Sequence, residues 1–261
     1  MFLEEIIEKR KIQLQREMSE TPPEEMIKKA ENAKFPKRSF KEALAKKGLG
    51  VIAEVKKASP SKGLIQPDFM PAQIAKEYEK AGAAAVSVLT EEAYFMGSAK
   101  YLSEVREAVD IPVLRKDFII DTYQIYEAKA LGANAVLLIA AVLDDSRFSE
   151  YYSLAKSLEM DVLAEAHNEN EVNRLVSLGA DIIGINNRDL KSFKVDIENT
   201  KRLIPLVPEG IITVCESGVK SHEDMENIAR WGASGVLIGE TLMRCGREGI
   251  GECFRGLVGE L

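Results

Sequence analysis

Histidine and cysteine are scarce in this sequence of 261 residues. It has two histidines, His167 and His222, and three cysteines, Cys215, Cys245 and Cys253. No CxxC or HExxH spacing occurs, so a zinc site has almost no ligands to draw on. Three scattered cysteines favour a reducing compartment over a disulfide framework. If the chain is an enzyme, we expect its acids and bases to be Glu and Lys.

Long apolar runs and a surplus of basic residues are also missing. The longest wholly apolar run is nine residues, Ala135 to Leu143, which is too short to span a bilayer. The N-terminus, MFLEEIIEKRK, mixes acids and bases where a signal peptide would have an apolar core. The 35 basic and 42 acidic residues leave a net charge of −7, which indicates no basic face for nucleic acid. We therefore expect a cytoplasmic protein that binds neither membranes nor nucleic acid.

One pattern occurs four times: a helical stretch, then Gly-Ala, then a short apolar run. The copies are EKAGAAAVSVL, KALGANAVLLI, VSLGADIIGI and ARWGASGVLI, with glycines at 82, 132, 179 and 232. A Gly that ends a helix and leads into a buried strand marks a helix–strand joint. Further strand candidates lie before and between these joints: VIAEVKK near 51, IPVLRKDF near 111, DVLAEAH near 161 and IITVCESG near 211. The four periods therefore hold eight strand–helix units.

Short apolar strands that alternate with amphipathic helices predict an all-parallel sheet. Eight such units fit a (β/α)8 barrel, the TIM barrel, which typically takes ~250 residues. An open doubly wound sheet is the alternative, but it normally has a glycine fingerprint after its first strand, where this chain has KKASPSKG. We expect residues 1–48 to form a helical extension packed on the barrel of residues 49–261, in one domain. These extra helices either cover one end of the barrel or help to form the rim of its pocket.

Charged residues lie at the carboxyl ends of several predicted strands, where this architecture carries its active site. Glu54 and Lys56 are two apart in the first strand, so both can point toward the barrel mouth. Lys116 ends the third strand and Glu165 the fifth. The set is either a layer of ion pairs or a general acid–base set, and we favour the second because partly buried ion pairs contribute little net stability. We expect His167, just after Glu165, to cap or pack.

The remaining strand ends indicate a polar network and a phosphate site. Asn186 and Arg188 follow the sixth strand, although an Asn in this place is also a common turn former. Ser217 and Gly218 follow the seventh strand and Gly239 follows the eighth. Glycines beside a hydroxyl at these two loops suit a phosphate, whose oxygens would meet backbone N–H groups. Ordinary tight turns are the alternative.

Five ordered motifs in this chain resemble the indole-3-glycerol-phosphate synthase family. They are IAEVKKASPS at 52–61, LRKDF at 114–118, IGINNRDL at 183–190, ESG at 216–218 and LIGE at 237–240. The similarity runs almost end to end and includes the N-terminal segment around Arg38 to Phe40. The family closes 1-(2-carboxyphenylamino)-1-deoxyribulose 5-phosphate to indole-3-glycerol phosphate in tryptophan biosynthesis, with loss of CO2 and water. The resemblance implies a lyase that acts on this phosphorylated small molecule without a metal or organic cofactor. We expect a monomer with no obligate protein partner.

The resemblance also implies roles for individual residues. Lys116 matches the acid that protonates the carbonyl oxygen under attack, and Lys56 matches the cation beside the substrate's carboxylate. Glu165 and Glu54 match the carboxylates of the dehydration step, in which Lys56 is a second candidate for the acid. Asn186 and Ser217 complete the catalytic set. The positions that match substrate-binding residues are Ser59, Phe95, Phe118, Leu137, Ile139, Arg188, Leu190, Gly218, Gly239 and Glu240.

Some members have serine in place of Glu240, so a phosphate donor at that position would be a backbone group only. Phosphoribosylanthranilate isomerisation is the alternative enzyme reaction, but it is expected to use a Cys at the end of the first strand with an Asp partner. This chain has Glu54 and Lys56 there. A Schiff-base aldolase acting through Lys116 is a further possibility. A non-catalytic, phosphate-binding scaffold subunit would have no need of acids and bases at four strand ends.

Overall fold

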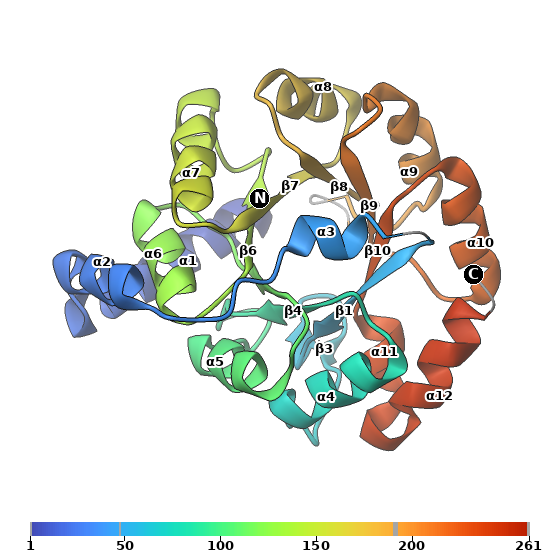
Figure 1. Ribbon diagram of the computed structural model, residues 1–261, viewed down its shortest axis with the longest axis horizontal. Coiled ribbons are helices and arrows are strands. Elements are labelled where there is room, and N and C mark those ends of the chain that lie inside the picture. The colour runs from blue at the N-terminus through green and yellow to red at the C-terminus, as the bar shows by residue number, and fades with distance from the viewer. Residues whose placement is uncertain (1, 47, 190–192, 260–261) are drawn as a thin grey trace.

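The computed structural model describes residues 2–46, 48–189 and 193–259, and its centre is a closed barrel of parallel strands (Figure 1). The strands pair in the order β1-β10-β9-β8-β7-β6-β5-β4, and β4 closes onto β1. They are β1 (Gly50–Val55), β4 (Ala85–Leu89), β5 (Val113–Lys116), β6 (Ala135–Ile139), β7 (Asp161–Ala166), β8 (Ile182–Asn186), β9 (Ile212–Glu216) and β10 (Gly235–Ile238). The predicted (β/α)8 barrel is therefore confirmed, and the open sheet is excluded. A short antiparallel hairpin, β2 (Ala58–Ser59) with β3 (Gly63–Leu64), lies in the loop after β1.

Helices follow the strands and form the outer ring of the barrel (Figure 1). They are α4 (Pro71–Ala81), α5 (Ala99–Ala108), α6 (Thr122–Ala130), α7 (Asp145–Ser157), α8 (Glu169–Ser177), α9 (Glu198–Leu203) with a 3-10 turn (Ile204–Leu206), α10 (His222–Trp231), α11 (Glu240–Arg244) and α12 (Gly246–Val258). Several begin at a side-chain cap: Asp121, Asp144, Asn168 and Ser221 each accept a backbone N–H of the first turn. The glycines of the four repeats all have positive φ, from 80° to 99°, so the predicted helix–strand joints are real.

The barrel interior is filled by inward-facing apolar side chains, among them Ile52, Leu114, Leu163 and Val214. The outward faces of the strands pack against the ring of helices in a second, larger apolar layer. This alternation of faces leaves the last inward position of each strand at the carboxyl end of the barrel free to carry a polar group.

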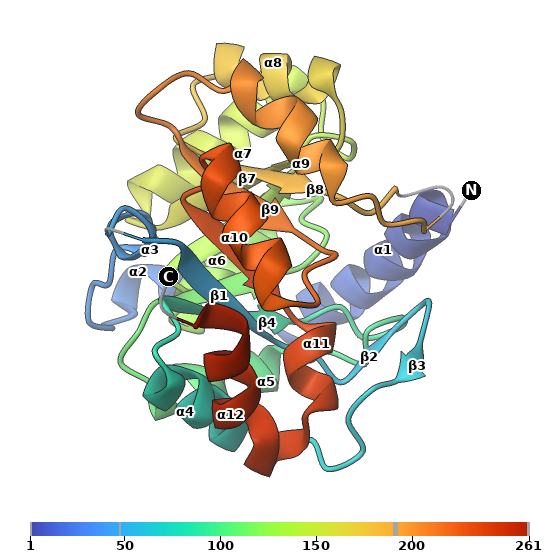
Figure 2. The same ribbon diagram turned by 90° about the vertical axis from the view of Figure 1, so that its right-hand side faces the viewer.

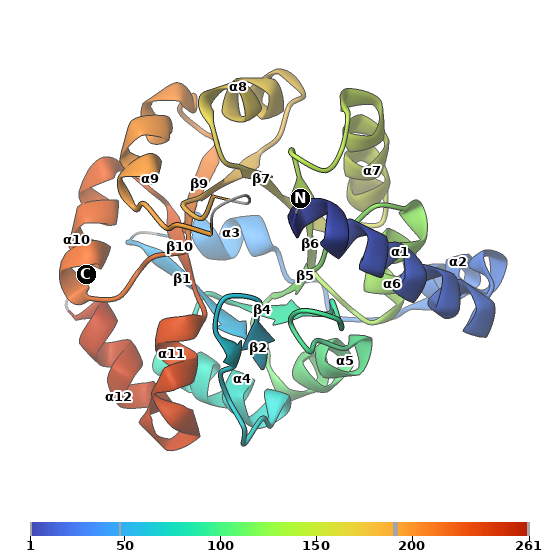
Figure 3. The same cartoon turned by 180° about the vertical axis from the view of Figure 1, so that it is seen from behind.

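The N-terminal segment contacts both ends of the barrel. It contains α1 (Phe2–Glu20), α2 (Pro23–Asn32) and α3 (Phe40–Leu44). Helix α3 buries Phe40 and Leu44 against the interior residues at the amino end of the strands, and it crosses the front of the barrel in Figure 1. Helix α1 lies over the opposite end, on the same side as the β2–β3 hairpin (Figures 2 and 3).

A buried charge network fixes α1 to the barrel. The Arg10 guanidinium donates to Asp117 through Nε at 3.0 Å and Nη2 at 3.1 Å. Asp117 also accepts from Arg115 Nη2 at 3.0 Å. The side chains of all three residues have no exposed surface. Opposite charges in full contact compensate for the cost of removing these ions from water.

Two of the three cysteines form a disulfide, which the sequence analysis did not expect. Cys245 follows α11 and Cys253 lies in α12, and the turn between the helices brings their Cα atoms to 6.4 Å. Cys215 is free and buried in β9. Within the described ranges of the chain, no helix is long and apolar enough to cross a membrane.

Candidate active site

The carboxyl ends of the strands open into a cavity of about 690 Å³, a volume typical of small-molecule sites. Fifteen of the sixteen site residues expected from the sequence line it. The remaining one, Leu190, lies outside the described residues. The lining residues are Glu54, Lys56, Ser59, Phe95, Lys116, Phe118, Leu137, Ile139, Glu165, Asn186, Arg188, Ser217, Gly218, Gly239 and Glu240.

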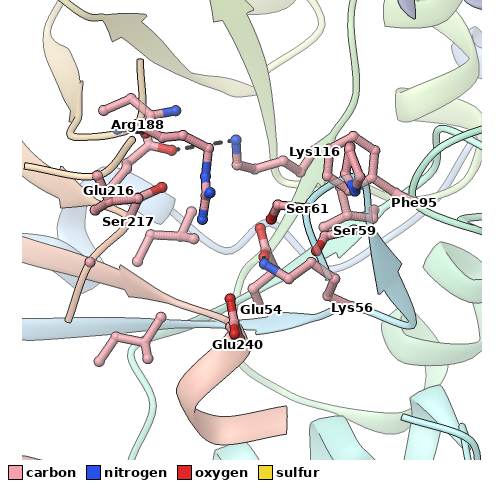
Figure 4. A pocket seen from close by; sticks show the side chains of 18 of the residues that line it. Glu54, Lys56, Ser59, Ser61, Phe95, Lys116, Arg188, Glu216, Ser217 and Glu240 are labelled. Atoms are coloured by element: carbon pink, nitrogen blue, oxygen red, sulfur yellow. Dashed lines mark hydrogen bonds and ion pairs between the residues drawn. The ribbon is translucent and has the colours of Figure 1, made fainter. Parts of the chain in front are cut away.

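One ion pair stands at the end of β1. Lys56 Nζ lies 2.7 Å from Glu54 Oε1, and both side chains are largely buried. The backbone of Gly239, after β10, passes directly beside this pair, and a β-carbon there would collide with both charged groups. Glycine at 239 thus lets the pair reach the edge of the cavity where the β10 loop begins (Figure 4).

A second charged group lies across the cavity at the end of β5. Lys116 Nζ lies 3.1 Å from Glu165 Oε2 on β7 and 3.4 Å from Glu216 Oε2 on β9. Burial alone would lower the pKa of Lys116, but the carboxylates of Glu165, Glu216 and Glu54 outweigh it and raise that pKa. Lys116 is therefore an ammonium ion throughout the neutral pH range, and it extends into the cavity (Figure 4).

The two carboxyl groups beside Lys116 are in opposite protonation states. Burial would raise the pKa of Glu165, but Lys116 and His167 outweigh it and hold that pKa well below its usual range. Burial and the nearby charge of Glu165 raise the pKa of Glu216 to about 8, against the opposing effect of Lys116. The site therefore holds an ionised carboxylate and a carboxyl group that keeps its proton near neutral pH, which are the two states required for general acid–base work.

Glu216 is a further functional candidate, which lies in the ESG motif but is not among the site residues expected above. Its side chain is buried and lies over the backbone of Gly184 on β8, where a β-carbon would collide with Oε1. The signal was available, because Val214 and Glu216 are two apart in β9 and share its inward face. The same alternation selected Glu54 on β1.

The loops after β9 and β10 form the side of the cavity expected to hold a phosphate. Ser217 has a φ of 68° and Gly218 a φ of 98°. A non-glycine residue in the left-handed region is strained, and such strain clusters at functional sites. The hydroxyl of Ser59, on β2, is buried and has no hydrogen-bond partner in the described part of the chain. Glu240 is paired with Arg244 at 2.9 Å, so its charge is offset.

Apolar side chains form another wall. The rings of Phe95 and Phe118 are 6.3 Å apart between centroids, and Leu137 and Ile139 of β6 lie beside them in the lining. The buried carboxylate of Glu91 accepts the backbone N–H of Phe95 at 3.1 Å, which fixes the loop that carries this ring.

The first helix closes the rim of the cavity. Leu3 and Ile6 of α1 both line it, so the extension contributes to the pocket as well as covering the barrel.

At the end of β8, Asn186 Oδ1 accepts the backbone N–H of Arg188 at 3.0 Å. The Arg188 guanidinium reaches into the cavity (Figure 4). In the described residues, no group of three or more His, Cys, Asp or Glu side chains could hold a metal ion.

Comparison with known proteins places the chain in a family. Residues 3–248 match the family described as Indole-3-glycerol phosphate synthase. The synthase of Thermoanaerobacter pseudethanolicus is 47% identical over 244 residues, which cover 94% of this chain and 93% of that protein. That of Alkaliphilus metalliredigens is 45% identical over 258 residues, 98% of each chain.

Solved structures of other proteins share the fold at low sequence identity. The N-acetylmannosamine-6-phosphate 2-epimerase of Clostridium perfringens has a TM-score of 0.60 at 15% identity, over 75% of this chain and 88% of that one. A chain of the tryptophan synthase complex of Pyrococcus furiosus has a TM-score of 0.58 at 13% identity, over 80% of this chain and 97% of that one. These likenesses concern the barrel alone, whereas the match over residues 3–248 and the identities near one half decide the family. The chain belongs to the indole-3-glycerol phosphate synthase family.

Proposed function

We propose that the cavity at the carboxyl end of the barrel binds 1-(2-carboxyphenylamino)-1-deoxyribulose 5-phosphate and that Lys116 is the general acid of its ring closure. The protein is a carbon–carbon lyase of tryptophan biosynthesis, which forms indole-3-glycerol phosphate with loss of CO2 and water. The observation that carries the role of Lys116 is its ammonium group, held 3.1 Å from Glu165 and 3.4 Å from Glu216 in the cavity lining.

In ring closure, the aromatic carbon that bears the carboxylate attacks the ribulose carbonyl carbon. The carbonyl π electrons move to oxygen, which becomes a strong base, and the Lys116 ammonium donates a proton to it. A raised pKa keeps this lysine protonated in the resting site, and an alkoxide is basic enough to take the proton. Loss of CO2 then returns its bonding electrons to the ring system.

The substrate's own carboxylate needs a cation until it leaves. Lys56, held by Glu54 at 2.7 Å, supplies this charge at the edge of the cavity. Attraction between a buried ammonium and a carboxylate is strong in a site that excludes water. Release of CO2 removes the negative charge and with it this attraction.

Dehydration needs a base at one carbon and an acid at the next. Glu165 is ionised at neutral pH, and we assign it the proton taken from the former ribulose C1. Glu54, or Lys56 beside it, protonates the departing hydroxyl group, which leaves as water. Asn186 and Arg188 orient the substrate between these groups.

The two ends of the substrate match two further walls of the cavity. Phe95, Phe118, Leu137 and Ile139 offer an apolar slot for the anthranilate ring. Ser217, Gly218 and Gly239 surround the phosphate, with the Ser59 hydroxyl as a further donor. In this proposal the side chains named above supply the acid, the base and the charges, and no resident metal or organic cofactor takes part.

We further propose a monomer that works in the cytoplasm without an obligate protein partner, with residues 1–48 and the barrel in one folded domain. Arg10 joins the extension to the barrel through buried contacts, which supports a single folded domain. Light scattering at assay concentration should give the mass of one chain, and thermal unfolding should show a single transition.

The test of the catalytic assignment is Lys116→Met, which removes the proton and keeps most of the side-chain volume. We expect turnover to fall about 10²–10⁴-fold while substrate binding and the circular dichroism spectrum are retained. Lys201→Met, which removes an exposed helix lysine, is the control and should leave turnover unchanged. Near-normal product formation by Lys116→Met would refute the assigned role.

A further inference from the structure

His167 lies at the end of β7 with a carboxylate on each side of its ring. Its Nε2 is 3.3 Å from Glu165 Oε1, and its Nδ1 is 3.3 Å from Glu171 Oε2. The imidazole is mostly buried. A carboxylate within ion-pair distance of each nitrogen favours the doubly protonated imidazole, which is a cation.

The surroundings fix the ring in this place. Glu171 in the first turn of α8 accepts the backbone N–H of His167 at 2.8 Å, and its other oxygen accepts from Asn168 Nδ2 at 2.6 Å. From α9, the neutral amide of Asn199 donates to the backbone oxygen of His167 at 3.1 Å. Among the described residues, the charged groups that face the ring are Glu165 on β7 and Glu171 on α8. Burial would lower the pKa of His167, but these two carboxylates raise it to about 10.

This cation touches only one of the two carboxyl groups around Lys116. Glu165 lies between Lys116 and His167, with contacts of 3.1 Å and 3.3 Å. Glu216 has the Lys116 contact at 3.4 Å, and His167 is not within ion-pair distance of it. Two carboxyl groups that share one lysine do not ionise equally, and an extra cation beside one of them determines which keeps the proton.

We propose that His167 is a positioning residue that keeps Glu165 ionised and directed at Lys116, so that Glu216 carries the proton of the carboxyl pair. His167 itself neither touches the substrate nor transfers a proton. Its effect acts through Glu165, and the inference therefore rests on the role proposed above for that carboxylate. Without His167, Glu165 would compete with Glu216 for the proton and would be less available as the base of dehydration.

The first test is a nitrogen-detected titration of the imidazoles in the wild-type enzyme by NMR. The chain has only two histidines, so His222→Gln assigns both signals. We expect the His167 ring to remain doubly protonated from pH 6 to pH 8.5, and Glu171→Gln to move its titration to lower pH. Titration of His167 near ~6.5, the ordinary value for histidine, would overturn the proposal. This result needs no activity, so it is independent of whether Glu165 is the base.

The second test is the pH dependence of kcat in His167→Gln, which can keep a donor near Nε2 and removes the charge. The acidic limb of the kcat profile should move up by about one pH unit, so that kcat measured on that limb falls about tenfold, while kcat at pH 8.5 changes much less. KM should change by less than about threefold, and the control His222→Gln should follow the wild-type profile. An unchanged profile, or an equal loss at every pH, would overturn the proposal. If His167→Gln does not fold, the titrations of Glu171→Gln and of the wild type test the proposal.

Discussion

The carboxylate of Glu216 occupies the space above the backbone of Gly184, where any other residue would place its β-carbon. The two residues lie on neighbouring strands, β8 and β9, in the inward-facing layer that ends at Lys116. Glycine at position 184 is thus required for the carboxyl group of Glu216 to lie in this place.

Gly184→Ala tests this condition. The new methyl group would push the carboxyl group of Glu216 away from Lys116, and we expect kcat to fall about 10–100-fold because Lys116 would lose one of the two carboxyl groups that hold its ammonium in the cavity. Gly256→Ala on α12 is the control, since nothing lies within 4 Å of its added β-carbon. A Gly184→Ala enzyme with normal kcat would mean that Glu216 has no part in turnover.

Glu165→Gln removes the ionised carboxylate and keeps its shape. We expect dehydration to slow about 10²–10⁴-fold, while ring closure, which depends on Lys116, is less affected. The decarboxylated, still hydroxylated intermediate should therefore accumulate in a single turnover and be visible by rapid quench and mass spectrometry. An unchanged rate of dehydration would place the base elsewhere.

The buried carboxyl group of Glu216 should make stability depend on pH. Its pKa is raised to about 8 in the folded chain, so the folded state keeps a proton that the unfolded state loses above its ordinary pKa. The stabilising contribution is full below pH ~4.5 and is lost as pH rises toward 8.

Glu216→Gln removes this dependence. Relative to the wild type, we expect the variant to gain about 4 kcal/mol of unfolding free energy between pH 5 and pH 9. Urea unfolding at a series of pH values measures the difference. If the unfolding free energies of the two proteins changed equally with pH, that result would contradict a raised pKa at this position.

Arg10 should hold the first helix on the barrel. Arg10→Met leaves Glu17 without its ion pair and Asp117 with Arg115 as its one cation among the described residues, and we expect a loss of about 3 kcal/mol in unfolding free energy. Arg16→Met on the same helix removes an exposed pair with Glu92 and should cost less than about 1 kcal/mol. Equal, small losses for the two variants would show that the buried network does not stabilise the fold.

Much of this arrangement could be predicted from sequence because it depends on short-range patterns. The Gly-Ala joints, the apolar runs between them and the caps each depend on residues within one turn or one strand. The alternation of faces in β1, with Glu54 and Lys56 two apart, was enough to place a pair at the barrel mouth.

Contacts between distant segments could not be predicted from the sequence. Arg10 and Asp117 are 107 residues apart, and no local pattern pairs them. The contact between His167 and Glu165 depends on the direction of one side chain at a strand end, where the backbone leaves the regular alternation. The disulfide between Cys245 and Cys253 depends on the turn between α11 and α12. Glu216 is the exception, since its inward position was readable from β9 itself.

The most direct measurement of the central claim is conversion of 1-(2-carboxyphenylamino)-1-deoxyribulose 5-phosphate by the purified, chelator-treated protein. Indole fluorescence follows the product, and trapped CO2 gives the stoichiometry. We predict indole-3-glycerol phosphate and CO2 in equal amounts, at a rate that Lys116→Met lowers about 10²–10⁴-fold. Absence of product from the wild-type protein would contradict the account.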